Sequence, residues 1–320
     1  MRLRLPFFFL PAALLALAWL LVPAPTRPAQ SKIPDPLDEL IATLEPMASP
    51  LPKPDPDDWL ANYREPGQTY AQWRVMDPVV ATPERHTIVI QPLGDLDPAQ
   101  REVMELAAEW LGVFFGLPYR LDPDLPSSLI PASARRLNPW THQPQVHAPS
   151  LLYGLLAPRL PADAFCLLGF TGEDLYPEAS WNFVFGQALL RARAGVWSMH
   201  RFGDPGESPE AFRTALLRTM KLATHETGHN FTMHHCTAHA CNMNGTNNLS
   251  ETDRSPVWFC PECLAKLLGA TGADPEARFE ELRAFCLRHG LEAEACYYSN
   301  ALRRLRAAVS GLPRPQGPEL

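Results

Sequence analysis

The hydrophobic and polar positions between residues 86 and 116 predict a strand followed by a helix. Residues 86–91, HTIVIQ, form a short β-branched run that ends at a proline, as a buried strand does. After Asp97, apolar residues recur at helical spacing until Gly116, and they are Val103, Leu106, Ala107, Trp110, Leu111 and Phe114. We therefore expect one strand and one amphipathic helix here.

Three more apolar runs in the middle of the chain predict strands. They are residues 164–170 (AFCLLGF), 181–187 (WNFVFGQ) and 194–199 (AGVWSM). Their apolar and aromatic content and their short length suit strands that are buried in a sheet. Together with the preceding helix, they indicate a fold that mixes α and β elements.

The second half of the chain is predicted to be mostly helical. Ser208 and Pro209 give a helix start, with a serine N-cap and a proline at the first helical position, and apolar residues continue the helix to His225. We expect a short helix at residues 264–268 and two helical segments, separated by a glycine, within residues 275–308. The last eight residues, PRPQGPEL, have the composition of a disordered tail.

The first 56 residues have a different pattern. Residues 5–22 carry no charge and follow two arginines, which is the pattern of an export signal. This run is also close to the length of a membrane span, so an uncleaved anchor is a second interpretation and a buried N-terminal helix a third. Residues 23–56 hold ten of the 35 prolines, which favours an extended tether. We expect a signal peptide or membrane anchor in residues 1–24 and a Pro-rich linker and lead-in in residues 25–80. A secreted, periplasmic or outward-facing membrane-anchored protein is favoured over a cytoplasmic one.

Composition limits the choice of partners. The chain of 320 residues is 46% hydrophobic, which is enough for a proper buried core. Its formal net charge of -7 and its lack of long Lys/Arg runs argue against nucleic-acid binding, because phosphate neutralisation needs clustered cations. We expect no nucleic-acid partner, and we expect a monomer. Of the seven cysteines, Cys166, Cys286 and Cys296 are interpreted as core residues, with a disulfide between the last two as the alternative.

Three histidines and a glutamate near the end of the predicted long helix have the spacing of a metal site. His225 and His229 are four residues apart, so both imidazoles lie on one helix face and can bind a single ion. Glu226 is rotated by about 100° from His225, which places its carboxylate beside the metal rather than on it. A third ligand is needed, and His235 supplies it if the helix ends near residue 230 and the chain turns back.

Three neutral imidazoles with an open fourth position are typical of catalytic zinc. Zinc lowers the pKa of a bound water to about 7 and polarises a carbonyl, while Glu226 moves a proton to the leaving amine. The predicted reaction is amide hydrolysis. His234 is the alternative third ligand, and His200 and His239 are expected on the surface or in the cleft, since neither has a spaced partner.

Four cysteines predict a second metal site. Cys236 and Cys241 form one closely spaced pair, and Cys260 and Cys263 form another after 18 intervening residues. Two such pairs close a tetrahedral four-thiolate zinc site, which is structural because it has no open position. Disulfides are the alternative in an oxidising compartment. We favour zinc, because its binding to such sites contributes about 10 kcal/mol or more.

This stretch resembles the archaemetzincins, zinc proteases of the metzincin group. The family motif reads H-E-x-x-H-x-x-G-x-x-H-C-x4-C-x-M-N, followed by C-P-x-C-x-x-K-L. The matching residues are His225, Glu226, His229, His235, Cys236, Cys241, Met243, Asn244, Cys260, Pro261, Cys263, Lys266 and Leu267. The resemblance extends upstream to residues 174–176 and 181–183 and covers about residues 86–270. We therefore expect a catalytic domain at residues 81–270 and a C-terminal helical segment with a tail at residues 271–320.

The resemblance implies a metzincin-like α/β fold of the α+β kind, in which a mixed twisted sheet carries a zinc-binding helix and a cysteine zinc loop. It implies two Zn²⁺ ions per chain, with the three histidines on the catalytic ion, the four cysteines on the structural one and Glu226 as general base. Met243 would be the methionine of the Met-turn beneath the catalytic ion. The expected substrate is a peptide or protein, extended along an edge strand of the sheet.

One residue departs from the family pattern. Thr232 stands where the family has a glycine, and a β-branched residue at positive φ costs about 1 kcal/mol or more. This departure is the only hint for the alternative function, a zinc-stabilised binding module of the same fold without turnover. The presence of Glu226 favours the peptidase, because a structural zinc has no use for a base beside it.

Overall fold

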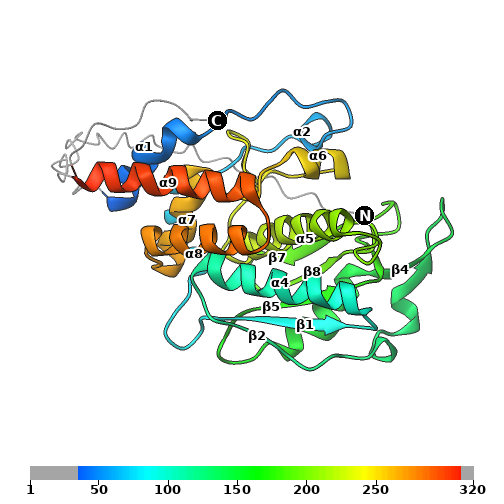
Figure 1. Ribbon diagram of the computed structural model, residues 1–320. Helices are drawn as coiled ribbons and strands as arrows, with labels where there is room; N and C mark the ends of the chain where they lie inside the picture. Colours follow the sequence, from blue (N-terminus) through cyan, green and yellow to red (C-terminus); the bar gives the residue numbers. More distant parts are fainter. Residues whose placement is uncertain (1–34, 311–320) are drawn as a thin grey trace, which may run out of the picture. The chain divides into compact units, whose positions relative to one another are not determined.

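A five-stranded sheet forms the lower part of the described chain in the view of Figure 1, and the computed structural model describes residues 35 to 310. In spatial order its strands are β2 (Tyr119–Leu121), β1 (Thr87–Leu93), β5 (Ala164–Thr171), β8 (Ala194–Ser198) and β7 (Gly186–Leu189). The first four are parallel, and β7 runs antiparallel to β8 at the edge. β1, β5 and β8 are almost entirely buried, which explains why they are continuous apolar runs in the sequence.

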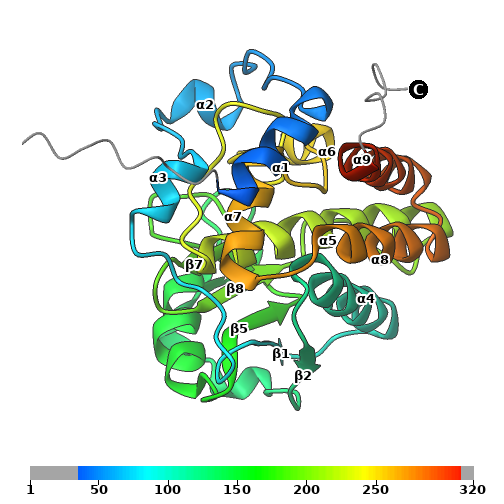
Figure 2. The same cartoon turned by 90° about the vertical axis from the view of Figure 1, so that its left-hand side faces the viewer.

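Two long helices pack against each other on one face of this sheet. They are α4 (Pro98–Phe115) and α5 (Pro209–Asn230) (Figure 2). α4 begins with a capping box at Asp97 and ends at Gly116, whose φ of 64° favours glycine. A second apolar cluster includes η4 (Ser150–Leu156), which contacts β5 and β8.

The remaining elements extend this core. A small sheet contains β3 (Arg135–Leu137), β4 (Pro144–His147) and β6 (Asp174–Tyr176), and the short helical turns are η2 (Ser127–Leu129), η3 (Ala132–Ala134) and η5 (Ala157–Arg159). The later helices are α6 (Leu249–Arg254), α7 (Pro261–Thr271), α8 (Pro275–Arg288) and α9 (Glu292–Ser310). The two C-terminal helices predicted around a glycine are confirmed, and Gly290 between them has a φ of 67°. They join the core at Trp110 of α4, whose ring lies 5.3 Å from Phe285 and 6.3 Å from Tyr298.

Helices, rather than an extended tether, occupy much of the described part of residues 23–56 and continue to residue 74. Residues 36–74 contain α1 (Pro36–Leu44), η1 (Glu45–Met47), α2 (Trp59–Asn62) and α3 (Tyr70–Arg74). Leu40, Leu44, Tyr70 and Trp73 from these elements are buried in the main core. The prolines misled the prediction because several of them stand at helix starts or between helices, where a missing N–H is tolerated.

Two strand predictions also need correction. The strand expected at residues 181–187 begins only at Gly186, because the carbonyl of Asn182 accepts side-chain hydrogen bonds instead of pairing in the sheet. β1 continues through Pro92, where the prediction ended it. The Pro92 carbonyl points away from β5 and accepts the N–H of Leu125. The proline nitrogen lies on the same side of the strand, so the N–H that Pro92 lacks would not have bonded to β5.

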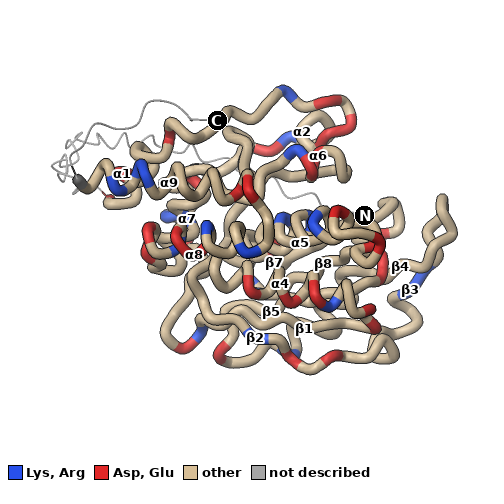
Figure 3. Tube along the Cα trace, in the orientation of Figure 1, with Lys and Arg blue, Asp and Glu red and all other residues tan. Residues whose placement is uncertain are grey.

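Several expectations fall outside what the structure tests. The signal or anchor segment and the C-terminal tail lie outside the described residues, and the domain boundaries stay predictions. No helix among residues 35–310 is long and apolar enough to cross a membrane. Basic and acidic residues are interspersed along the described chain (Figure 3), and the prediction that no nucleic acid binds is untested.

Candidate metal centre and active site

Helix α5 carries the first two histidines on one face. Its start is capped by Ser208, whose hydroxyl accepts a backbone N–H of the first turn (3.1 Å). Further along, the hydroxyl of Thr224 accepts a hydrogen bond from Trp110 Nε1 (2.9 Å), which fixes the helix against α4. His225 and His229 follow with their ring centroids 4.6 Å apart, as residues four apart on a helix should.

The chain turns back directly after α5 and brings in the third histidine. The helix ends at Asn230, and Thr232 has a φ of 61°, in the left-handed region. The ring of His235 then lies 5.1 Å from the rings of both His225 and His229. One ligand atom from each of the three histidines lies within 4.8 Å of the others.

Thr232 adopts the strained backbone of a glycine turn, and its side chain offsets part of the cost. Its hydroxyl accepts the backbone N–H of Val79 (2.8 Å), and the residue is buried. A glycine would have no such acceptor. The hydrogen bond contributes about 1 kcal/mol, which is similar to the strain of one residue in this region. The turn is therefore kept, and the position of His235 is not disturbed.

Each histidine ring is oriented by an acceptor at Nδ1. His225 Nδ1 lies 2.8 Å from the carbonyl oxygen of Asn242, and His229 Nδ1 lies 2.7 Å from that of Met233. His235 Nδ1 lies 2.8 Å from a carboxylate oxygen of Glu65. Carbonyl and carboxylate oxygens only accept, so we assign the proton of each ring to Nδ1. Each Nε2 is then left with a lone pair that can bind a metal ion.

The inner nitrogens form a gap that suits a metal ion. The Nε2 atoms of His225 and His229 are 3.0 Å apart, and two lone pairs at this distance repel each other unless a cation lies between them. Tetrahedral zinc with bonds of about 2.0 to 2.1 Å separates its nitrogen ligands by roughly 3.3 Å. The residues present therefore fit zinc.

Burial keeps the imidazoles of His225 and His229 neutral, which is the form that binds metal. Burial, together with the nearby His235, lowers the pKa of His225 to about 3. Burial also lowers the pKa of His229 well below its ordinary value, and the neighbouring His225 and His235 act in the same direction. For Glu65, burial acts to raise the pKa, but its hydrogen bond to His235 and the electrostatic interaction with that ring hold the pKa below the usual value.

Glu226 is buried beside the histidines. Its side chain is 5% exposed, and burial raises its pKa to about 8. A cation on the three imidazoles would favour the charged carboxylate instead. The side chain packs against Gly186 of β7, where an added Cβ would lie 2.8 Å from Glu226 Oε1 and 3.0 Å from the carbonyl oxygen of Val196. The glycine on the edge strand therefore leaves the space that the glutamate occupies.

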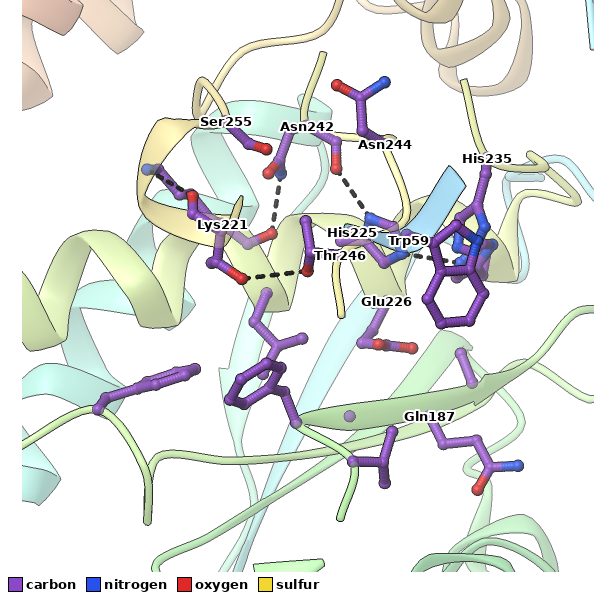
Figure 4. A pocket seen from close by; sticks show the side chains of 18 residues that line it. Trp59, Gln187, Lys221, His225, Glu226, His235, Asn242, Asn244, Thr246 and Ser255 are labelled. Carbon is purple, nitrogen blue, oxygen red and sulfur yellow. Dashed lines mark hydrogen bonds between the residues drawn. The ribbon is translucent and has the colours of Figure 1, made fainter. Parts of the chain in front are cut away.

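A cavity of about 240 Å³ opens beside Glu226. Figure 4 shows the carboxylate of Glu226 between α5 and the strand that carries Gln187. The loop after α5 closes the other side with Asn242, Asn244 and Thr246. The cavity thus gives a ligand access to both the histidines and the glutamate.

The four cysteines form a second group. Their sulfur atoms lie within 4.8 Å of one another, and all four thiols are free. Cys236 Sγ and Cys260 Sγ are 3.8 Å apart, whereas a disulfide bond is about 2.05 Å long. Zinc–sulfur bonds of about 2.3 Å in a tetrahedron give a separation of roughly 3.8 Å. The backbone N–H of Cys260 also donates to Cys241 Sγ (3.2 Å), which stabilises a thiolate. This donor set fits zinc better than disulfides.

Met243 connects the two groups. A Cβ added at Gly228, between the first two histidines of α5, would lie 2.4 Å from Met243 Sδ. The Met243 carbonyl accepts the N–H of Cys236 (2.7 Å), and its own N–H donates to Cys241 Sγ (3.4 Å). The methionine thus packs on the helix at the level of the histidines and is tied to the cysteine loop.

Comparison with known proteins identifies the family. The profile of Peptidase family M54 matches residues 162–268. Human archaemetzincin-2 is 35% identical over 279 residues, which are 77% of this chain and 76% of the human protein. The chain belongs to the archaemetzincin family. Rat archaemetzincin-2 is 31% identical over 303 residues, 84% of this chain and 82% of the rat protein. The crystal structure of archaemetzincin from Archaeoglobus fulgidus is 28% identical and covers 56% of this chain and 99% of its own, with a TM-score of 0.45.

The predicted family is thereby confirmed, and with it the enzyme class. Family M54 contains metzincin-type zinc peptidases, so this archaemetzincin is a metallopeptidase that hydrolyses peptide bonds. The mixed α/β fold with a histidine triad and a cysteine cluster near a helix agrees with the prediction. The individual roles of the site residues are not decided by family membership alone.

The other histidines of this archaemetzincin lie outside the triad. His234 donates its backbone N–H to Gln68 Oε1 (3.2 Å), and its ring is not part of either metal-ligand group. His239 Nε2 lies 3.4 Å from Glu45. His200 Nδ1 lies 3.3 Å from a glycine carbonyl oxygen near the protein surface.

Sequence reasoning missed the part of the site that residues 59–68 supply. The ring of Trp59 lies edge-on to His235 at 5.3 Å and lines the cavity, and Glu65 contacts the same histidine. No spacing pattern connects two residues that are 170 positions apart in the chain. A second omission is Lys221, whose buried ammonium group donates to two carbonyl oxygens at the end of α6 (3.1 and 3.0 Å).

Proposed function

We propose that His225, His229 and His235 hold a catalytic zinc ion and that Glu226 is the general base of peptide-bond hydrolysis. The observation that carries the proposal is the convergence of three Nε2 lone pairs next to a buried carboxylate that faces a cavity. When bound there, zinc supplies a Lewis acid that polarises the scissile carbonyl and lowers the pKa of the attacking water to about 7.

The chain's own residues would handle the proton. Glu226 takes a proton from the attacking water and passes it to the nitrogen of the leaving amine. Its position between α5 and Gly186 restricts the carboxylate to the side of the cavity where water and substrate enter. The carbonyl and carboxylate acceptors at each Nδ1 keep the rings in the required tautomer and orientation.

The edge of the sheet offers a place for the substrate. β7 lies beside Glu226 and, among the described strands, pairs with β8 alone. An extended peptide could add to this edge through backbone hydrogen bonds and present its scissile bond to the histidines. We infer that the substrate is a peptide or protein segment in extended conformation.

We propose a second, structural zinc ion on Cys236, Cys241, Cys260 and Cys263. All four ligands come from the protein, so no position is open for a substrate. The support is the sulfur spacing, the free thiols and the backbone N–H that donates to one of the sulfurs. Its role would be to hold the loop that carries the Met243 and Asn242 carbonyls.

Removal of the metal tests the zinc proposal. Treatment with a strong chelator should abolish peptide cleavage by the wild-type protein, and zinc should restore it. The His229→Ala variant should keep only the cysteine-bound zinc and should regain no activity. Full cleavage by the metal-free protein would contradict the proposal, and two bound zinc ions without any cleavage would favour the binding module.

We also propose that this peptidase acts outside the cytoplasm. The support is the charge-free stretch at residues 5–22 behind two arginines. Mass spectrometry of the N-terminus after expression in an exporting host tests this directly. Recovery of the full-length protein from the cytoplasm, and none from the membrane or the medium, would contradict it.

A further inference from the structure

The loop that carries the third histidine is held by a segment from the beginning of the described chain. Gln68 Nε2 donates to the carbonyl of Thr232 (3.2 Å), and Gln68 Oε1 accepts the N–H of His234 (3.2 Å). The N–H of Val79 donates to the hydroxyl of Thr232. These contacts reach both the strained residue itself and His234, which directly precedes the third histidine.

Glu65 of this segment reaches the third histidine itself. Its two carboxylate oxygens lie 3.0 and 2.8 Å from His235 Nδ1. Both side chains are mostly buried, with 16% of His235 and 26% of Glu65 exposed. The ring of Trp59 packs edge-on against the same imidazole at 5.3 Å and shields this contact from one side.

This contact differs from those of the other two histidines. His225 and His229 are oriented by backbone carbonyls close to them in the chain, whereas His235 depends on a charged side chain 170 residues away. A carboxylate at the outer nitrogen fixes the tautomer of a metal-binding imidazole and raises its basicity. His235 also comes from a loop rather than from a helix, so its orientation needs more support.

We propose that Glu65 is a positioning residue for the third histidine and that residues 59–68 are part of the metal centre. This inference rests on the proposed catalytic zinc site. It assigns to Glu65 the task of holding His235 with its Nε2 toward the other two rings. Loss of the carboxylate should weaken metal binding at the histidines while the fold persists.

The segment has anchors that do not involve Glu65, so the role can be tested separately from folding. Asp58 pairs with Arg254 of α6 (2.8 Å), and the N–H of Trp59 donates to Glu251 (3.0 Å). Gln68 keeps its own contacts to the turn. We therefore expect the segment to stay docked when Glu65 is changed.

The experiment measures zinc affinity at the histidine site by competition with a chromophoric chelator. The cysteine site is identified by the same titration on the His229→Ala variant. Glu65→Ala should bind zinc at the histidines about 10- to 100-fold more weakly than wild type. Glu65→Gln should lie between the two, because its amide oxygen still accepts a hydrogen bond but carries no charge. The thermal unfolding of metal-free Glu65→Gln should match that of metal-free wild type.

Asp58→Asn is the matched control, since it removes an anchor of the same segment without touching a histidine. Its zinc affinity should equal that of wild type. Equal affinity for Glu65→Ala and wild type, with a folded protein, would overturn the inference. Equal weakening by Asp58→Asn would also overturn it, because the effect would then come from docking of the segment. A wild-type protein without zinc at the histidines would instead refute the proposed function.

Discussion

Loss of the cysteine site should weaken the histidine site, because the same loop supports both. Cys260→Ser removes one of the four sulfur ligands that would bind the structural zinc. Serine is a good N-cap, and Cys260 is the N-cap of α7, so the start of that helix should be kept. The perturbation is therefore confined to the loop at residues 236–263.

The size of the effect follows from two connections. His235 directly precedes Cys236, and His225 Nδ1 is held by the carbonyl of Asn242, which follows Cys241. Loss of one outer partner of a metal-binding histidine typically lowers affinity 10- to 100-fold. This corresponds to about 1.4 to 2.7 kcal/mol of binding free energy. We expect at least a tenfold weaker histidine site in Cys260→Ser.

The assay combines zinc content after dialysis with peptide cleavage at limiting zinc. Cys286→Ser is the control, because Cys286 is also buried and free but lies in α8, outside the cluster. It should keep two zinc ions and full activity. Full zinc occupancy of the histidines and unchanged activity in Cys260→Ser would refute the proposed coupling between the sites.

Substitutions at three more positions test the geometry around the site. Gly186→Ala should lower kcat about 10²-fold with unchanged zinc content, because its methyl group would displace the Glu226 carboxylate; wild-type kcat would contradict this. Gly228→Ala should destabilise the fold by about 1 to 3 kcal/mol in urea denaturation, because it collides with Met243, and a stabilised variant would show that this contact relaxes freely. Thr232→Ala should lose about 1 to 3 kcal/mol, since it keeps the strain but leaves a backbone N–H unpaired. Thr232→Gly should be the more stable of the two, and the reverse order in the same denaturation assay would argue against strain at this turn.

The two groups of candidate metal ligands were predictable because their spacing is local. Residues four apart on a helix must share a face, so His225 and His229 could be paired without knowledge of the rest of the fold. Two closely spaced cysteine pairs likewise point to a tetrahedral site. The end of the helix near residue 230 followed from the need for a third ligand, and α5 does end at Asn230.

The supporting residues could not be predicted, because they act through contacts between distant parts of the chain. Nothing in the sequence near Glu65 indicates a partner at His235, and residues 59–73 have no period clear enough to predict an element. The strand β7 begins later than predicted, because side chains donate hydrogen bonds to the Asn182 carbonyl and hold the preceding residues in a loop. The hydrophobic pattern of the sequence does not reveal such hydrogen bonds. Local spacing pointed to the proposed ligands, whereas tertiary packing decides what orients them.

Cleavage by zinc-loaded Glu226→Gln tests the central claim most directly. Glutamine keeps the size of the side chain and its place between α5 and β7, but it cannot accept a proton at neutral pH. Wild type and variant would be loaded with zinc to equal content, and cleavage of a peptide library would be followed by mass spectrometry. We predict a loss of about 10² to 10⁴-fold in kcat/KM with unchanged zinc content. Equal cleavage by the two proteins would contradict the role of Glu226 as the general base of this peptidase.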